Sequence, residues 1–274
     1  MSHLKIVIQI VNFICHNPGN RGKRFAKLAQ AFRWQISKRV TGRPRTIRLV
    51  NGVRFKAYSD CVVSSAVQYA DWPEYHEIQF CRKFLKPGDT VIDVGANVGH
   101  FSLLLSDVVG ADNIYCFEPT PVSWRRLVEN FELNHWPTSR LLQVALGAAE
   151  GTVEFPDTES PVTTNSLSST AKKKTSVQMK TFDSLSNSFL PGSIALLKID
   201  VEGYEEQLFA GAKNFLTQIQ PRLIMFESLS GSLRPEIRRT LNDSGYWVFQ
   251  LDEQGRPDDT QSLNAQNLFA ARKG

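Results

Sequence analysis

The chain has 274 residues, of which 42% are apolar and 22% charged, so it can bury a sizeable core and is neither disordered nor fibrous. The apolar stretch over residues 4–15 is interrupted by polar residues and is shorter than the roughly 20 residues that span a bilayer. It also lacks the preceding basic cluster and the following cleavage pattern of a secretory signal. Four cysteines lie far apart without a C-x-x-C pair, which predicts reduced thiols in a cytoplasmic protein.

The net charge of +5 is divided unevenly along the chain. Residues 1–59 contain 13 of the 32 Lys and Arg residues and none of the 27 Asp and Glu residues. Within that segment apolar residues recur at helical spacing, and most of the neighbouring bases fall off that stripe, which predicts a basic amphipathic helix. The stripe consists of Phe25, Leu28, Ala29, Phe32 and Ile36.

This basic helix has two interpretations. The first is binding to an anionic partner, such as a membrane surface, an acidic glycan or a phosphate group. The second, and commoner, is docking onto the main domain with a solvated basic face. Nucleic acid is a disfavoured partner, because no aromatic-interleaved basic motif and no zinc-finger spacing accompanies the charge. The protein is therefore expected in the cytoplasm, with peripheral membrane attachment through residues 1–59 as the alternative.

Further elements follow in chain order. Residues 47–50 and 53–56 alternate around Asn51-Gly52, which predicts a β-hairpin. A helix is expected over residues 74–85, where Pro87-Gly88 ends it. Regular alternation then begins. Strands are expected at residues 90–94, 113–117, 141–146, 193–199, 222–227, 246–251 and 267–271, and helices at 98–108, 121–133, 203–217 and 234–243.

Strands that alternate with helices predict an α/β fold with a doubly wound, mostly parallel sheet. The last two strands are joined without a helix and predict an antiparallel edge strand. Residues 151–180 interrupt the alternation: 152–155 predict a small extra strand, and 163–174 are rich in Ser and Thr and end in three lysines. An insertion beside the carboxyl ends of the strands is either a lid over a substrate or a solvated loop.

The first strand of this series ends in a turn that reads DVGANVG over residues 93–99. Gly95 and Gly99 leave no side chain there, so a ligand could approach the backbone and the amides at the helix start. The spacing differs from the G-x-G-x-x-G turn of an NAD-dependent oxidoreductase. Asp93 would repel a pyrophosphate and suits a ligand that carries positive charge.

Glu118 follows the second strand of the series. In doubly wound nucleotide folds an acid there accepts hydrogen bonds from both ribose hydroxyls. The alternative is a helix-capping acid ahead of Pro119. Together with the turn at residues 93–99, Glu118 predicts a cationic nucleoside ligand without phosphate, and S-adenosylmethionine has that chemistry.

Acidic residues also follow the fourth and fifth strands. Asp200 and Glu202 lie in the segment KIDVEGYE at residues 198–205, and Glu227 ends the next strand. Three carboxylates at one rim would raise each other's pKa, which is useful for a general base. The alternative is that they are first-turn acids that interact with a helix dipole, which explains Glu202 and Glu205 easily and Asp200 and Glu227 less well.

The segments DVGANVG at 93–99, FEP at 117–119, ALG at 145–147 and KIDVEGYE at 198–205 resemble, in order and spacing, the FkbM-type methyltransferases. The resemblance extends over residues 72–272. It implies a class I, Rossmann-like fold that methylates hydroxyls of sugars, polyketides and related glycosylated products with S-adenosylmethionine, as in polysaccharide biosynthesis. Two parts are then expected, a basic extension over residues 1–59 and a methyltransferase domain over residues 60–274.

On this resemblance the turn at residues 93–99 would hold the methionine part of the cofactor, Glu118 the ribose, and residues 145–147 the adenine. The cofactor contacts expected are Asp93, Gly95, Ala96, Asn97, Gly99, Glu118, Pro119, Ala145, Leu146 and Asp200. Asp200 is the first candidate for the general base, with Glu202 beside it and His100 as a rival.

Two alternatives accompany this prediction. Asp200 and Glu227 could hold Mg²⁺ against a vicinal diol, but nothing in the spacing demands it, so no metal site is assigned. The chain could also be a non-catalytic methyltransferase-like module that its basic segment recruits to an anionic surface. Such a module would have no catalytic function and no sugar or other small-molecule substrate. No oligomeric state is predicted.

Overall fold

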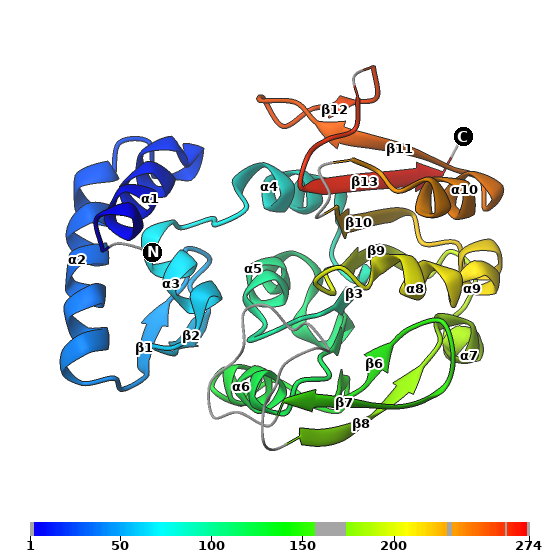
Figure 1. The fold of residues 1–274 in the computed structure, drawn as a ribbon, viewed down its shortest axis with the longest axis horizontal. Helices are drawn as coiled ribbons and strands as arrows, with labels where there is room; N and C mark the ends of the chain where they lie inside the picture. Colours follow the sequence, from blue (N-terminus) through cyan, green and yellow to red (C-terminus); the bar gives the residue numbers. More distant parts are fainter. Residues whose placement is uncertain (1–2, 157–173, 229–231, 261, 273–274) are drawn as a thin grey trace.

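The computed structural model describes residues 3–156, 174–228, 232–260 and 262–272. Within these ranges the main feature is an eight-stranded sheet in the order β12-β11-β13-β10-β9-β3-β4-β5 (Figure 1). The strands are β3 Thr90–Val94, β4 Ile114–Phe117, β5 Leu141–Leu142, β9 Ile194–Ile199, β10 Leu223–Glu227, β11 Tyr246–Leu251, β12 Pro257–Asp258 and β13 Asn267–Arg272. The five strands from β5 to β10 run parallel, whereas β13 runs antiparallel to β10 and β11. The predicted doubly wound sheet with an antiparallel element at one edge is confirmed.

The central strands are apolar over nearly their whole length because both faces of the sheet are covered. Every residue of β9 and β10 is buried. Successive side chains point to opposite faces, so Val91 packs into one core and Ile92 into the other. This explains why these strands read as continuous apolar runs in the sequence.

Helices cover both faces of the sheet. On one face lie α4 Tyr75–Phe84, α5 His100–Val109 and α6 Pro121–Glu132, and on the other α7 Phe182–Leu185, α8 Glu205–Ala210, α9 Lys213–Gln218 and α10 Pro235–Asp243 (Figure 1). Phe101 and Phe131 belong to the first core, and Phe209 and Leu241 to the second. The chain changes face between α5 and α8, which creates a crevice at the carboxyl ends of β3 and β9.

A second, three-stranded sheet lies beside this crevice, in the order β6-β8-β7. Its strands are β6 Ala145–Leu146, β7 Gly151–Pro156 and β8 Lys174–Lys180. The extra strand predicted at residues 152–155 is confirmed as β7, whereas β8 was not predicted. The strand predicted at residues 141–146 is in fact two short strands, β5 and β6, in different sheets. Most of the Ser- and Thr-rich segment at residues 163–174 lies outside the described residues.

The helix predicted over residues 203–217 is two helices, α8 and α9. The chain bends at Gly211, where a Cβ atom would lie 2.1 Å from the carbonyl oxygen of Gly147. Only glycine fits at this close approach of two backbones, and the approach holds α8 against the second sheet.

The N-terminal region consists of α1 His3–His16, a 3₁₀ turn at Pro18–Asn20, α2 Arg24–Val40, the hairpin β1 Arg45–Arg48 and β2 Arg54–Ala57, and α3 Val62–Tyr69. The predicted hairpin is confirmed, and Gly52 in its turn has a φ of 86°. Neither α1 nor α3 was predicted. No described helix has both the length and the hydropathy needed to cross a membrane.

The predicted basic helix is confirmed as α2, but of its apolar stripe only Leu28 packs against the core, and the rest lies away from the buried face. Phe25 is 90% exposed and Phe32 68% exposed. The buried side chains of α2 are Lys27, Ala31, Trp34 and Ser37. Trp34 donates a hydrogen bond from Nε1 to the Ser65 hydroxyl of α3 at 3.1 Å. The second interpretation of the helix is thus correct about docking, while the face that it leaves in solvent is apolar as well as basic.

Candidate active site

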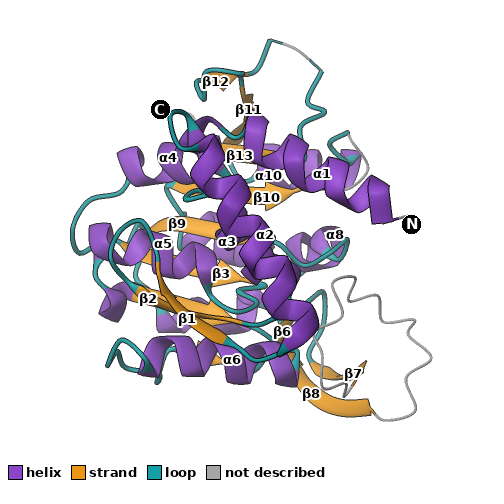
Figure 2. Ribbon diagram, turned by 90° about the vertical axis from the view of Figure 1, so that its left-hand side faces the viewer, coloured by secondary structure: helices purple, strands orange, loops and turns teal. Residues whose placement is uncertain are grey.

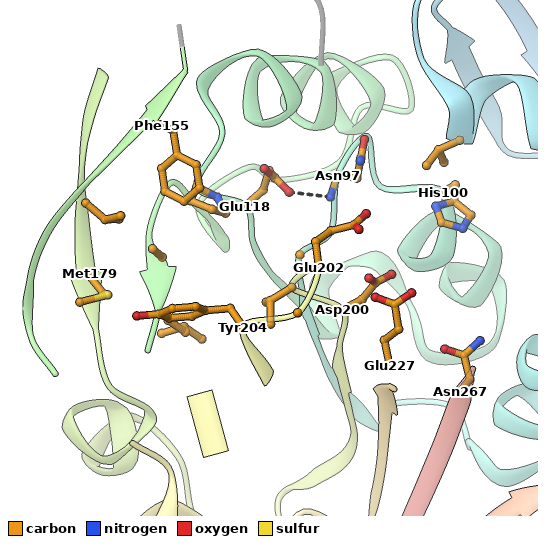
Figure 3. A pocket seen from close by; sticks show the side chains of 18 of the residues that line it. Asn97, His100, Glu118, Phe155, Met179, Asp200, Glu202, Tyr204, Glu227 and Asn267 are labelled. Carbon is orange, nitrogen blue, oxygen red and sulfur yellow. Dashed lines mark hydrogen bonds between the residues drawn. The ribbon is translucent and has the colours of Figure 1, made fainter. Parts of the chain in front are cut away.

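The crevice at the carboxyl ends of β3, β4, β9 and β10 contains a cavity of about 340 Å³ (Figure 3). The second sheet forms its opposite wall. Cavities at this position in doubly wound folds bind ligands, because loops from both halves of the sheet converge there. The described residues that line the cavity therefore form the candidate site.

Glu118 holds the loop between β3 and α5. Its Oε2 accepts a hydrogen bond from the backbone N–H of Asn97 at 2.8 Å, and its Oε1 accepts one from the N–H of Thr120 at 2.9 Å. The side chain lines the cavity although the residue is only 3% exposed, and burial raises its pKa to about 7 against these hydrogen bonds. Asn97 has a φ of 52°, so the carboxylate stabilises a backbone conformation that asparagine tolerates. Glu118 thus braces the loops before α5 and α6, without capping α6 itself, and also reaches the cavity.

The two glycines of the turn between β3 and α5 are required for different structural reasons. A Cβ on Gly95 would lie 1.7 Å from the carbonyl oxygen of Asp200, so glycine lets the loops after β3 and β9 touch. A Cβ on Gly99 would lie 2.6 Å from Cδ1 of Leu127, so glycine lets α5 pack against α6. Gly95 lines the cavity, whereas Gly99 is not among its lining residues. The prediction that both glycines clear space for a ligand is therefore corrected at Gly99, which serves helix packing.

A buried lysine links the two loops. Lys198 is 2% exposed, and its Nζ lies 3.3 Å from Oδ1 of Asp93 and 3.2 Å from Oδ2 of Asp200. Burial opposes the charge of Lys198, but the carboxylates of Asp200 and Asp93 outweigh burial and raise its pKa. Asp93 is fully buried, accepts a hydrogen bond from Ser102 at 2.7 Å and does not line the cavity. Asp93, predicted as a cofactor contact, therefore fixes Lys198 beneath the floor of the cavity instead.

Three carboxylates meet at the rim of the cavity, as predicted from their places after β9 and β10. Figure 3 shows the carboxyl groups of Asp200 and Glu227 side by side, with Glu202 above them. Burial raises the pKa of Glu227 to about 7, a hydrogen bond from Gln266 opposes this, and the charges of Asp200 and Glu202 add to it. Burial and the charge of Asp200 also raise the pKa of Glu202. The rim is therefore a cluster of acids in which burial and neighbouring charges bring the pKa of Glu227 to about 7.

Glu205 of the same motif has a purely local role. Its Oε1 accepts hydrogen bonds from the backbone N–H groups of Val201 and Gly203 at 3.2 and 3.1 Å. Glu205 is also the first residue of α8, so the interpretation as a first-turn acid applies to it, whereas Glu202 lies ahead of the helix. The turn that it stabilises carries Glu202, whose φ is 54°.

His100 and Glu74 form one side of the cavity. His100 Nε2 lies 3.8 Å from Oε1 of Glu74, and the imidazole is buried at the start of α5. Burial tends to raise the pKa of Glu74, but His100 and Lys198 lower it overall. His100 lies in the site as predicted, where it is paired with an acid from upstream of α4.

An apolar wall closes the side of the cavity nearest the second sheet. Leu146, Phe155 and Met179 come from the three strands of that sheet. Figure 3 shows the ring of Tyr204 beside Met179. A Cβ on Gly147 would lie 3.0 Å from Cε1 of Tyr204, so the neighbouring glycine leaves room for the ring. Phe155, Met179 and Tyr204 were not predicted as site residues. The alternating residues of β7 predict a strand, but they do not predict that this strand lies beside the cavity.

The structure brings most of the predicted site residues together. Those that line the cavity are Gly95, Asn97, His100, Glu118, Pro119, Ala145, Leu146, Asp200 and Glu202. Those that do not line it are Asp93, Ala96 and Gly99. Among the described residues no group of three or more His, Cys, Asp or Glu side chains has the geometry of a metal site.

Comparisons with known proteins point to one family. The model of the methyltransferase FkbM domain matches residues 93–248. Methyltransferase sdnD of Sordaria araneosa is 26% identical over 207 residues, which cover 64% of this chain and 80% of the relative. Hexuronic acid methyltransferase AglP of Haloferax volcanii is 26% identical over 159 residues, which cover 57% of this chain and 62% of the relative.

A solved structure of a SAM-dependent methyltransferase from Agrobacterium tumefaciens is a distant likeness, with a TM-score of 0.46 and 12% identity over 85% of this chain and 71% of that chain. The family match spans the strands β3 to β10 and most of the loops that line the cavity. It confirms the predicted class I methyltransferase fold. The chain belongs to the FkbM methyltransferase family.

Proposed function

We propose that this chain is an S-adenosylmethionine-dependent O-methyltransferase that acts on a hydroxyl of a sugar, glycoconjugate or related natural product. The observation that carries this proposal is one cavity with Glu118 and an apolar wall at one end and three carboxylates at the other. Such a division suits a ligand with an apolar base, a sugar and a cationic centre.

The residues present fit that cofactor. Asn97 Oδ1 and Glu227 Oε2 are buried, and neither has a hydrogen-bond partner among the described residues. Buried polar atoms at the wall of a cavity are satisfied by a ligand or by water. Each carboxylate oxygen of Glu118 already accepts one backbone N–H and has a second lone pair for a ribose hydroxyl.

The cofactor end of the site positions its ligand by shape and hydrogen bonding. The flat face of an adenine would pack against Leu146 and Phe155, since apolar and aromatic side chains line this wall. Asn97 offers a side-chain acceptor for the amino acid part of the ligand. When bound, S-adenosylmethionine supplies a methyl group on a positively charged sulfur.

The acidic end takes the acceptor proton. Asp200 is the first candidate for the general base, but its Oδ2 lies 3.2 Å from the Lys198 ammonium, so this oxygen is already engaged with a cation. Glu227 is paired with neutral Gln266 and has a pKa of about 7, near the value at which a general base works best. We assign the proton transfer to Glu227 Oε2, and to Asp200 the orientation of the acceptor.

A hydroxyl acceptor on a sugar has support from a relative. AglP is named as a hexuronic acid methyltransferase. An acidic rim binds sugar hydroxyls well, because carboxylates are strong hydrogen-bond acceptors. The rim would also repel a fully ionised uronate, so a neutral sugar or one with an esterified carboxyl group is the better substrate class.

Methyl transfer from ¹³CH₃-labelled S-adenosylmethionine to a panel of neutral and uronic acid glycosides tests this proposal. The expected product contains a labelled methyl ether, which survives mild alkaline hydrolysis, whereas a methyl ester does not. Calorimetric titration with the cofactor, using Glu253→Gln as a surface control, separates the catalytic proposal from a binding module. If S-adenosylmethionine does not bind at millimolar concentration, the proposal that the chain is a methyltransferase enzyme is rejected. Binding without transfer to any acceptor would favour the non-catalytic module.

A further inference from the structure

The outer side of the N-terminal region has an exposed apolar face. We define the outer face as the exposed apolar side chains along one side of α1 and one side of α2. These are Leu4, Val7, Ile8 and Val11 on α1 and Phe25, Phe32, Ile36 and Val40 on α2. Figure 2 shows both helices in front of the sheet, with the N-terminal end of α1 projecting past the body of the molecule. Large apolar side chains gathered on one surface mark an interaction site.

The exposure of this face is not due to loose packing of α2. On the opposite side Trp34 is 2% exposed, and Lys27 Nζ lies 2.6 Å from Oδ1 of Asp71. Asn17 and Asn20, in the connection between the two helices, also donate hydrogen bonds to backbone carbonyls of the segment at residues 69–73. The two helices are thus fixed to the body of the protein through polar contacts, and their apolar stripe faces outward.

Basic side chains border the outer face. Arg24, Arg33 and Arg39 of α2 are exposed and make no salt bridge with any described residue. At helical spacing Arg33 and Arg39 lie on either side of the stripe through Phe32 and Ile36. Residues 1–59 contain 13 basic residues and no acidic one, so the surroundings of this face are strongly cationic.

We propose that the outer face docks this protein onto an anionic lipid surface. A helix with aromatic and aliphatic residues on one side and arginines at the borders lies in the headgroup region of a bilayer, where its apolar side reaches the acyl chains. The arginines then pair with lipid phosphates and anionic headgroups. A second copy of the chain fits less well, because two such basic faces would repel each other.

Flotation of the full chain with vesicles tests this docking site. The vesicles contain either phosphatidylcholine alone or phosphatidylcholine with phosphatidylglycerol, and the salt concentration is low or high. We expect binding to the anionic vesicles at low salt, at least tenfold weaker binding to the neutral ones, and a marked loss at high salt. Equal binding to both kinds of vesicle, or no binding at low salt, would overturn the proposal.

Two sets of variants separate the apolar and basic contributions. Phe25→Ser with Phe32→Ser, and Arg33→Gln with Arg39→Gln, should each weaken vesicle binding at least tenfold without lowering the melting temperature, because all four side chains are exposed. Leu190→Ser and Arg238→Gln, which change an exposed apolar and an exposed basic residue elsewhere, should leave binding unchanged.

Light scattering of the protein without lipid addresses the competing occupant. If the parent is a dimer and the variant with both Phe25→Ser and Phe32→Ser is a monomer, the lipid proposal is overturned in favour of a contact between copies of the chain. Methyl transfer to a small soluble acceptor should be the same in parent and variants, so failure of the docking proposal and failure of the proposed function are distinguishable.

Discussion

Two regions of this protein each bury a lysine, and they do so for opposite purposes. Lys198 lies under the cavity between Asp93 and Asp200 and joins the loops after β3 and β9. Lys27 pairs with Asp71 on the inner side of α2, while Phe25 and Phe32 of the same helix face solvent. In the sheet the buried lysine holds together two loops that form the cavity. On α2 the buried charge anchors a helix whose apolar side is kept for another surface.

The comparison teaches that apolar periodicity marks a surface without saying what covers it. In β9 and β10 the apolar residues meet the protein's own core. In α2 the same kind of pattern points outward, because specific polar contacts fix the other side. If the chemistry lies at the sheet and the recognition at α2, substitutions in the two regions should change different properties of the protein.

The largest effect is expected for Glu227→Gln. The amide keeps the shape of the side chain but accepts no proton, so turnover should fall about 10²–10⁴-fold with little change in cofactor affinity. In the parent, kcat at saturating cofactor should rise as the pH increases through about 7, because the ionised carboxylate is the base. This rise should disappear in the variant. Full activity would return the assignment to Asp200 or His100, and Glu253→Gln is the matched control.

A large loss of stability is expected for Lys198→Met. Removal of the ammonium leaves Asp93 fully buried without its cation, which costs about 3–5 kcal/mol when one partner of a buried pair is lost. Adding Asp93→Asn should recover part of this loss, since the uncompensated charge is then gone. Urea denaturation measures both, with the exposed Lys213→Met as control. A loss below about 1 kcal/mol would show that the lysine is not the link between the two loops.

A smaller effect is expected for Glu118→Gln. The amide oxygen can keep one backbone hydrogen bond, but the charge-assisted bonds to a ribose are lost, so cofactor binding should weaken by about 1–3 kcal/mol. Since burial raises the pKa of Glu118 to about 7, the parent should bind the cofactor more tightly as the pH rises through that value, and the variant should not. Calorimetry at several pH values checks this. If the variant binds the cofactor as tightly as the parent at high pH, the assignment of Glu118 to the ribose is rejected.

The sequence predicted the sheet and much of the site because both depend on local pattern. Buried strands read as apolar runs, and the loops after them carry the polar residues of the cavity, including Glu118 and Asp200. Pairings over long distances could not be predicted in this way. The Lys198–Asp93 contact, the Glu74–His100 pair and the wall that includes Met179 depend on which elements the fold brings together.

The smallest effect distinguishes the two sides of α2. Phe32→Ser should change the free energy of unfolding by no more than about 0.5 kcal/mol, because the ring is 68% exposed. Trp34→Ala, two positions along the same helix, should cost about 3–5 kcal/mol through the cavity it leaves and the lost bond to Ser65. Urea denaturation measures both. Equal losses would mean that the stripe packs against the protein, whereas a large difference keeps Phe32 available for lipid.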